Sequence, residues 1–397
     1  MPQLAAELTT VVNQLLDQVQ PSAIRAFDDR ISKIPGIIKL TIGEPDLDTP
    51  EHVKQAGIQS IANNESHYSA QKGTPELRQA ISNYLKDTQN VTYDPETEVI
   101  VTVGATEALT AAMFTLLNPG DEVIIPTPAF ALYFPIVTLT GAHPIMVDTS
   151  ASDFVLTPEL LTKTLEEHPH ARAVLLNYPS NPTGREYSKD ELSSLATIIA
   201  DQGLYVIADE IYSELLYEGQ HFSIACLLPE RTILVSGLSK SHAMTGYRIG
   251  YLAAPAAVVA NIAKMHGFLV TAPVTPCQAA AAEALNNGRQ DAKAAVKIYQ
   301  KRRDNLVQSL EKLGFQTVAP QGAFYLFAKI PAAFNQDDVA FALQLAEEAK
   351  VGCTPGSGFG TGGEGYLRFS YAASDADIAA VSERLTNFVK QHTRREF

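Results

Sequence analysis

Between residues 99 and 253 the chain repeats one pattern, a short apolar run followed in most cases by an amphipathic stretch. The apolar runs predict strands at 99–103, 122–126, 144–148, 173–177, 204–209, 232–236 and 249–253. Between most of them the spacing predicts helices, notably at 106–117, 157–166 and 188–201. Strands that alternate with helices form a mostly parallel sheet with helices on both faces. The expected fold class is therefore α/β.

The length of 397 residues favours two domains over one. We expect residues 46–285 to form the larger domain around the parallel sheet and residues 286–397 to form a smaller α+β domain. Beyond Pro276 the spacing predicts a helical tract to residue 313 and further helices at 337–350 and 374–389, the last with Ser374 as its N-cap. Residues 1–45 are predicted to be an N-terminal arm that joins the smaller domain, helical over 1–35 with a break at Pro21.

Composition excludes several classes of function. A formal charge of -14 argues against nucleic acid or an anionic membrane as partner, because both require basic surface. The three cysteines, Cys226, Cys277 and Cys353, show no CxxC spacing, and the nine histidines are scattered, so no metal site is expected. The sequence has neither a basic start followed by an apolar core nor a stretch of membrane-spanning length. We therefore expect a cytoplasmic protein.

Lys240 is the first candidate for chemistry. It follows the predicted strand 232–236 through a turn of small residues, a place where burial disfavours the charged form of an amine. A neutral amine can form a Schiff base with an aldehyde cofactor. A solvated loop lysine is the alternative, and it is the commoner one for a lysine taken alone.

Three further motifs lie where predicted strands end. Gly104-Ala-Thr-Glu opens a helix and suits either a bound phosphate or an ordinary helix cap. Two X-Pro steps hold Asn181 rigidly, either as turn chemistry or to position its amide. Asp209 ends an apolar strand with Tyr212 close behind, and it needs either a cationic partner, such as a protonated ring nitrogen, or a helix to cap.

Two motifs near the C-terminus are interpreted differently. The segment 358–363 matches GxGxxG, but no strand-helix unit surrounds it, so we predict a loop and no dinucleotide site. Arg368 lies inside a predicted strand, where charge is costly. It either faces solvent or clamps a carboxylate with two parallel hydrogen bonds.

Taken together, these motifs resemble the class I/II aminotransferases, which are fold-type I pyridoxal-phosphate enzymes. The resemblance covers nearly the whole chain and is carried by IGEPD at 42–46, NPTG at 181–184, DEIY at 209–212, SKSHAMTGYRIG at 239–250 and LRFSYA at 367–372. Within the family, the set is most similar to bacterial aromatic-amino-acid transaminases and to relatives that act on acetylated diaminopimelate.

The resemblance implies a role for each site residue. Lys240 would bind pyridoxal 5′-phosphate and shuttle a proton, and Asp209 would keep the pyridine nitrogen protonated. Tyr212 and Asn181 would donate to the phenolic oxygen of the ring. Phe130 would stack on the ring, and Tyr68 would reach a phosphate in the other subunit of a homodimer. The phosphate would be held by Gly104, Ala105, Thr106, Ser239 and Arg248. The substrate α-carboxylate would be bound by Gly43, Asn181 and Arg368. Many relatives have Ser where this chain has Gly237, so one phosphate hydroxyl is missing.

Substrate choice rests on fewer residues. The apolar residues Ile24, Phe27 and Ile42 are expected at the entrance and suit an aromatic or aliphatic side chain. Aspartate-preferring relatives often have Lys where this chain has Thr106, so strict aspartate specificity is disfavoured. We expect an aromatic amino donor, phenylalanine or tyrosine, and 2-oxoglutarate as acceptor. An N-acetyl-diaminopimelate aminotransferase, a broad-specificity or aspartate aminotransferase, and a C–S β-lyase stay open as alternatives.

Overall fold

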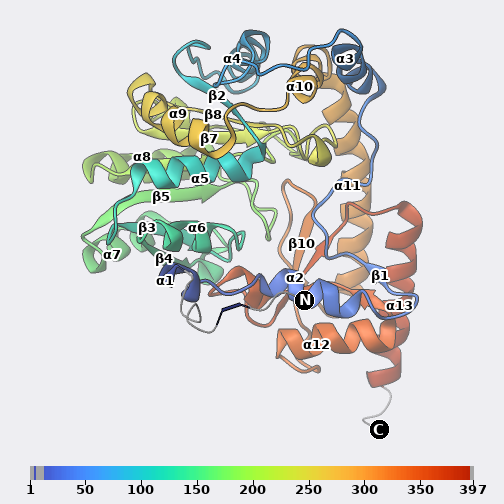
Figure 1. Cartoon of the computed structure of the whole chain (residues 1–397). Helices are drawn as coiled ribbons and strands as arrows, with labels where there is room; N and C mark the ends of the chain where they lie inside the picture. The colour runs from blue at the N-terminus through green and yellow to red at the C-terminus, as the bar shows by residue number, and fades with distance from the viewer. Residues whose placement is uncertain (1–3, 6–12, 394–397) are drawn as a thin grey trace.

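A computed structural model describes residues 4–5 and 13–393, and Figure 1 shows two sheet-containing bodies beside a long helix. The larger body contains a seven-stranded sheet. Its strand order is β2 (Val99–Thr102), β8 (Gly250–Ala253), β7 (Thr232–Gly237), β6 (Tyr205–Asp209), β5 (Ala171–Asn177), β3 (Glu122–Thr127) and β4 (His143–Asp148). β8 is antiparallel to both of its neighbours, and the other pairs are parallel.

Helices cover both faces of this sheet. The helices α5 (Gly104–Leu116), α6 (Tyr133–Leu139) and α9 (Ala256–Val270) share one apolar cluster with the sheet, and α7 (Pro158–Glu167) and α8 (Lys189–Asp201) share another. Successive residues of β5 alternate between the clusters, because Leu175 belongs to the first, and Val174 and Leu176 to the second. Since helices cover both faces, most of the strands are apolar and buried, whereas the edge strand β4 exposes His143, Met146 and Asp148.

The smaller body is built on an antiparallel sheet. Its strand order is β12 (Thr354–Pro355), β13 (Tyr366–Ser370), β10 (Tyr325–Lys329) and β9 (Gln316–Thr317). The helices α12 (Asp338–Gln344) and α13 (Asp375–Thr393) pack with this sheet in one core. Ser374 caps α13, since its Oγ accepts from Asp377 N at 3.1 Å, in agreement with the sequence.

The N-terminal arm packs onto the smaller body. It contains α1 (Gln14–Asp17), α2 (Ala23–Ile31) and β1 (Ile38–Lys39), which pairs in parallel with β11 (Val351–Gly352). Phe27 and Ile31 of α2 are buried in the core of the smaller body. The predicted arm extends over residues 1–3 and 6–12 as well, which lie outside the described residues.

Three helices lie at the side of the larger body and a fourth reaches the smaller one. The helices α3 (Glu51–Ala62), α4 (Pro75–Gln89) and α10 (Thr275–Asn287) share a core with β2 and β8. The 24-residue helix α11 (Arg289–Lys312) runs from this region into the core of the smaller body (Figure 1). Across residues 4–5 and 13–393, no helix combines the length and the hydropathy needed to cross a membrane.

The predicted strands between residues 99 and 253 are all confirmed, with small differences at their ends. One helix prediction is corrected, because the tract predicted from 276 to 313 divides at Gly288. The helix predicted over 337–350 is confirmed, with a π-helical turn at Leu345–Ala349, and α9 was not predicted. The domain boundaries after residues 45 and 285 stay predictions.

Candidate active site

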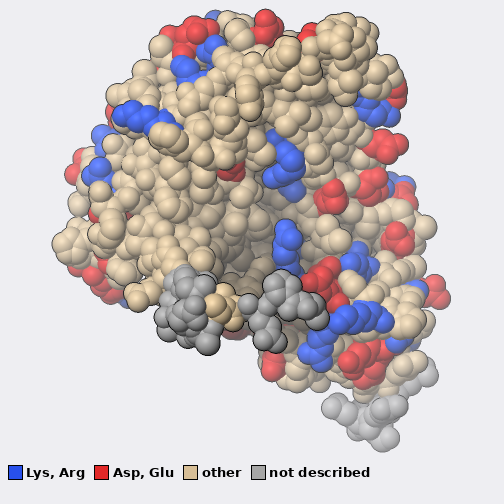
Figure 2. All heavy atoms as spheres, viewed as in Figure 1, with Lys and Arg blue, Asp and Glu red and all other residues tan. Residues whose placement is uncertain are grey.

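A cavity of about 570 Å³ lies beyond the carboxyl ends of β5, β6 and β7, where the arm and the smaller body face the large sheet. The strand register brings these ends together, because Asn177 pairs with Asp209 and Asp209 with Val235. Figure 2 shows the surface hollowed between the two bodies, with basic side chains near the edge of the hollow. In parallel sheets this edge is where ligands bind.

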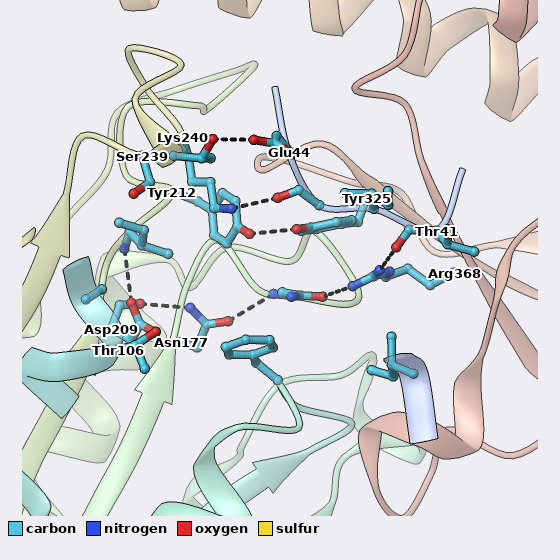
Figure 3. A pocket seen from close by; sticks show the side chains of 18 of the residues that line it. Thr41, Glu44, Thr106, Asn177, Asp209, Tyr212, Ser239, Lys240, Tyr325 and Arg368 are labelled. Carbon is cyan, nitrogen blue, oxygen red and sulfur yellow. Dashed lines mark hydrogen bonds between the residues drawn. The ribbon is translucent and has the colours of Figure 1, made fainter. Parts of the chain in front are cut away.

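Lys240 points into this cavity from the loop after β7 (Figure 3). Its Nζ donates a hydrogen bond to the carbonyl oxygen of Gly43 at 2.6 Å. Burial lowers the pKa of Lys240 to about 8, and the neighbouring Arg368 and Arg248 act in the same direction. The amine therefore loses its proton far more easily than an exposed lysine does.

Asp209, at the end of β6, is a buried carboxylate with two neutral donors. Its Oδ2 accepts the hydroxyl of Tyr133 at 2.7 Å, and its Oδ1 accepts the backbone N–H of Ile211 at 3.3 Å. Burial raises the pKa of Asp209 to about 6, although the hydrogen bond from Tyr133 works against that rise. Such a carboxylate is suited to a cationic partner inside the cavity.

The start of α5 forms an anion site with Arg248. The helix has no side-chain cap, so the N–H groups of its first turn, at Gly104, Ala105 and Thr106, are available to a ligand. Gly104 has φ +75°, and a Cβ there would lie 2.6 Å from Nη2 of Arg248. The guanidinium thus packs directly on the glycine, and Ser239 lines the cavity beside it. The cradle suits a phosphate.

A second set of polar groups faces this cradle across the cavity. The Tyr212 and Tyr325 hydroxyls are 2.7 Å apart. Burial raises the pKa of Tyr212 well above its usual value, so its hydroxyl keeps its proton. Asn181 accepts a hydrogen bond from Arg368 through Oδ1 at 2.9 Å, and among the described residues its Nδ2 has no partner. That amide N–H group is available to a ligand.

Arg368 is buried on β13 and is held by hydrogen bonds and by aromatic rings. Its Nη1 donates to Asn181, and its Nη2 donates to the carbonyl oxygen of Thr41 at 2.6 Å. The guanidinium carbon lies 4.5 Å from the ring centroid of Tyr325 and 4.8 Å from that of Phe359. Its Nε has no partner among the described residues. An arginine fixed in this way presents a planar fork to a carboxylate.

The structure gathers most of the residues predicted from the sequence around this one cavity. Those that line it are Gly43, Ala105, Thr106, Phe130, Asn181, Asp209, Tyr212, Ser239, Lys240, Arg248 and Arg368. Gly104 lies directly behind the lining, against Arg248. Tyr68 lies outside the cavity and is 87% exposed.

One entrance residue is corrected. Ile24 and Ile42 line the cavity, but Phe27 does not, because it faces the core of the smaller body. Residues 24 and 27 are three apart on α2, and helical spacing alone did not show which neighbour turns inward.

Sequence reasoning missed Tyr133, Tyr325 and Asn177 as site residues. Tyr133 and Tyr325 carry no local motif, and only the tertiary fold brings them to Asp209 and Tyr212. Asn177 did have a signal, since it begins the turn that holds Asn181. Its Oδ1 accepts from Asn181 N at 2.9 Å, and its Nδ2 donates to the carbonyl oxygen of Asp209 at 2.9 Å (Figure 3).

Comparison with known proteins agrees with this geometry. Residues 35–385 match the family described as aminotransferase class I and II. The chain is 42% identical over 379 residues to the probable N-acetyl-LL-diaminopimelate aminotransferase of Bacillus subtilis strain 168, with 96% of each chain covered. It is 38% identical over 382 residues to aromatic-amino-acid aminotransferase 2 of Thermococcus litoralis, and this match covers 95% of this chain and 97% of the Thermococcus chain.

A solved structure, aspartate aminotransferase from Thermus thermophilus with maleate, superposes with a TM-score of 0.90 at 36% identity. The match covers 95% of this chain and 99% of that one. The names of these relatives share one reaction and differ in the amino acid.

Proposed function

Because this chain belongs to the class I and II aminotransferases, which use pyridoxal 5′-phosphate, we propose that it transfers the amino group of an aromatic L-amino acid to 2-oxoglutarate. The proposal of an aromatic amino donor rests on the apolar lining of the cavity, which is supplied by Ile24, Ile42, Leu109, Phe130 and Ile211. An aromatic side chain is stabilised by burial against such a surface.

The proposal of 2-oxoglutarate as acceptor is supported by one further cationic side chain in the cavity. Arg25 of α2 lines the cavity, and its guanidinium has no partner among the described residues. Thr106 gives no charge at the position where aspartate-preferring relatives often have Lys. A dicarboxylate such as 2-oxoglutarate therefore has Arg368 for one end and Arg25 for the other.

The residues present fit the cofactor. The uncapped start of α5 and Arg248 form a cradle for its phosphate, and the unpaired N–H group of Asn181 and the Tyr212 hydroxyl can donate to the phenolic oxygen of its ring. Asp209 is placed to hold a proton on the ring nitrogen, and Phe130 to stack on the ring. When bound, the cofactor supplies a protonated heterocycle that accepts the electrons released at the α-carbon of the amino acid.

We assign the chemical steps to three residues. Arg368 binds the substrate α-carboxylate, helped by the Gly43 backbone and Asn181, and this fixes the orientation of the α-carbon. Lys240, with its lowered pKa, takes the proton from that α-carbon and would deliver it to a carbon of the bound cofactor. Asp209 would use its negative charge to hold a proton on the ring nitrogen, and the resulting positive charge of the ring would stabilise the negative charge that develops on the substrate.

We also propose that the enzyme works as a homodimer with Tyr68 reaching the partner's phosphate. Tyr68 projects from the loop 66–74, which is tied to α10 by the hydrogen bond from Thr275 Oγ1 to the His67 carbonyl oxygen at 3.0 Å. Large exposed apolar residues occur on this loop, on α3, and between the end of α9 and the start of α10; they are Ile58, Ile61, Tyr68, Phe268, Leu269 and Val274. Such a surface is typical of a subunit interface. A cytoplasmic location is proposed as well, supported by three free cysteines.

Amino-donor profiling of the purified holoenzyme with 2-oxoglutarate tests the proposal. We expect phenylalanine and tyrosine to be the best donors, with glutamate formed in equal amount to the oxo acid product. A panel in which both are inert contradicts the aromatic assignment. If N-acetyl-LL-diaminopimelate is then the active donor, the specificity named for the Bacillus relative holds instead. Release of ammonia and pyruvate from cysteine conjugates would identify a C–S β-lyase.

A further inference from the structure

A buried histidine joins two parts of the chain that the proposed function uses separately. His266 of α9 is fully buried. Its Nδ1 lies 2.9 Å from Oε1 of Glu107 on α5, and its Nε2 lies 2.6 Å from the carbonyl oxygen of Gln71. None of the steps described above involves either His266 or Glu107.

The hydrogen bonds define the charge of this histidine. The Gln71 carbonyl can only accept, and Glu107 as a carboxylate can only accept as well, with its other oxygen taking the backbone N–H of Val103 at 2.8 Å. Both ring nitrogens of His266 must therefore carry hydrogen, which makes it an imidazolium. Burial works to lower the pKa of His266, but the hydrogen bond and charge of Glu107 outweigh burial, and the pKa is raised. Among the described residues, Glu107 is the only titratable group that influences it.

Each partner of His266 leads to a different part of the cofactor site. Glu107 lies in the first turn of α5, directly after the residues 104–106 that form the phosphate cradle. Gln71 belongs to the loop that carries Tyr68. The far side of that loop is held by Gln278 of α10, whose Nε2 donates to Ser69 Oγ at 3.0 Å and whose Oε1 accepts from Thr74 N at 2.7 Å.

We propose that His266 is a positioning residue whose imidazolium ties the Tyr68 loop to the phosphate-holding turn of α5. Its positive charge also offsets the carboxylate of Glu107, which otherwise lies near a dianionic phosphate. The proposal rests on the proposed function at one point, the contact of Tyr68 with the partner's cofactor.

The first test measures how fast pyridoxal 5′-phosphate leaves the holoenzyme. His266→Gln removes one of two charge-assisted hydrogen bonds and should speed release at neutral pH by about tenfold or more. In the wild type, release should accelerate as pH rises above the ordinary histidine pKa, because the neutral ring keeps a hydrogen on one nitrogen only. Release from His266→Gln at the wild-type rate overturns the proposal.

Glu107→Gln is the sharper variant, and it also serves if His266→Gln does not fold. The new amide can still accept from Val103 N and can donate to a neutral His266 at Nδ1, so the loop stays tied without any charge. Release should then lose the pH dependence attributed to His266. The matched control is Glu122→Gln, since Glu122 pairs with His168 at 3.0 Å at the opposite end of the sheet. Equal pH profiles for Glu107→Gln and Glu122→Gln overturn the proposal.

A double-mutant cycle separates this inference from the proposed function. If His266 acts through Tyr68, His266→Gln should have little further effect on release in a Tyr68→Phe background, and full additivity overturns the inference. Wild-type release by Tyr68→Phe would instead remove the assigned contact of Tyr68. In that case hydrogen exchange of residues 66–73 decides: exchange at least about tenfold faster in His266→Gln supports the tie, and unchanged exchange refutes it.

Discussion

Asp209→Asn should make the cofactor-free protein more stable and the enzyme inactive. Asp209 is only 3% exposed, and its pKa is raised from 3.8 to about 6. The folded state therefore holds the proton more tightly than the unfolded chain does. The stabilisation is fully present below the unfolded pKa and is lost as pH rises through about 6.

The size of the effect follows from the two pKa values. Compared with a neutral side chain, Asp209 destabilises the folded protein by about 3 kcal/mol at pH 8, where it must stay ionised, and by about half of that at pH 5, where it must stay protonated; asparagine avoids both costs. For a chain of this length, unfolding entropy near the melting temperature is about 0.8 kcal/mol per kelvin. Asp209→Asn should therefore raise the Tm of the cofactor-free protein by about 4 °C at pH 8 and by about 2 °C at pH 5.

Differential scanning calorimetry of the cofactor-free wild type, Asp209→Asn and the control Asp201→Asn at both pH values measures this. Asp201 is an exposed residue at the end of α8, and its substitution should leave Tm nearly unchanged. Adding pyridoxal 5′-phosphate should reverse the order, because only the carboxylate gains a cationic partner. A Tm difference that does not grow with pH, or a less stable Asp209→Asn protein at pH 8, would refute the reasoning.

Other substitutions have separate expected outcomes. Lys240→Ala should still bind the cofactor through its phosphate, as measured by equilibrium dialysis, while steady-state turnover falls by at least about a thousandfold; near wild-type turnover would exclude the lysine as the proton carrier. Arg368→Lys should raise KM for amino and oxo acids alike by roughly tenfold or more, because an ammonium cannot offer two parallel hydrogen bonds; unchanged KM values would disprove the carboxylate contact. Gly104→Ala should weaken cofactor binding by about tenfold or more, since a side chain at φ +75° is strained and its Cβ meets Arg248 at 2.6 Å; spectrophotometric titration with the cofactor measures this, and wild-type affinity would mean that the cradle can shift.

The fold was predictable from sequence where the hydrophobic pattern was regular. Most strands of the large sheet are buried on both faces, and their apolar runs identified them. α9 was missed because apolar residues from Val258 to Val270 lie on several sides of the helix, so that no single apolar face stands out. The division at Gly288 was missed because the flanking helical patterns run up to the glycine on both sides.

The candidate site was predictable where its residues lie in motifs at strand ends. Lys240, Asp209 and Asn181 each follow a recognisable run, and the register of a parallel sheet brings such ends together. Tyr133 and His266 could not be found in this way, because each acts on a residue more than 70 positions away in sequence. Their partners are fixed only by how helices pack on the sheet, which leaves no local signature.

The N-terminal arm contacts both Lys240 and Arg368 through its main chain, with the carbonyl oxygen of Gly43 on Lys240 and that of Thr41 on Arg368. Truncation of the arm's side chains would therefore overlook both contacts, since no arm side chain takes part in them. Substitutions that bend the backbone should reveal them. Gly43 is the position to choose, because a Cβ there would meet the Tyr325 hydroxyl and push the arm away from both cations. Mutational maps built on side-chain truncation would thus miss two backbone contacts on which both charged groups depend.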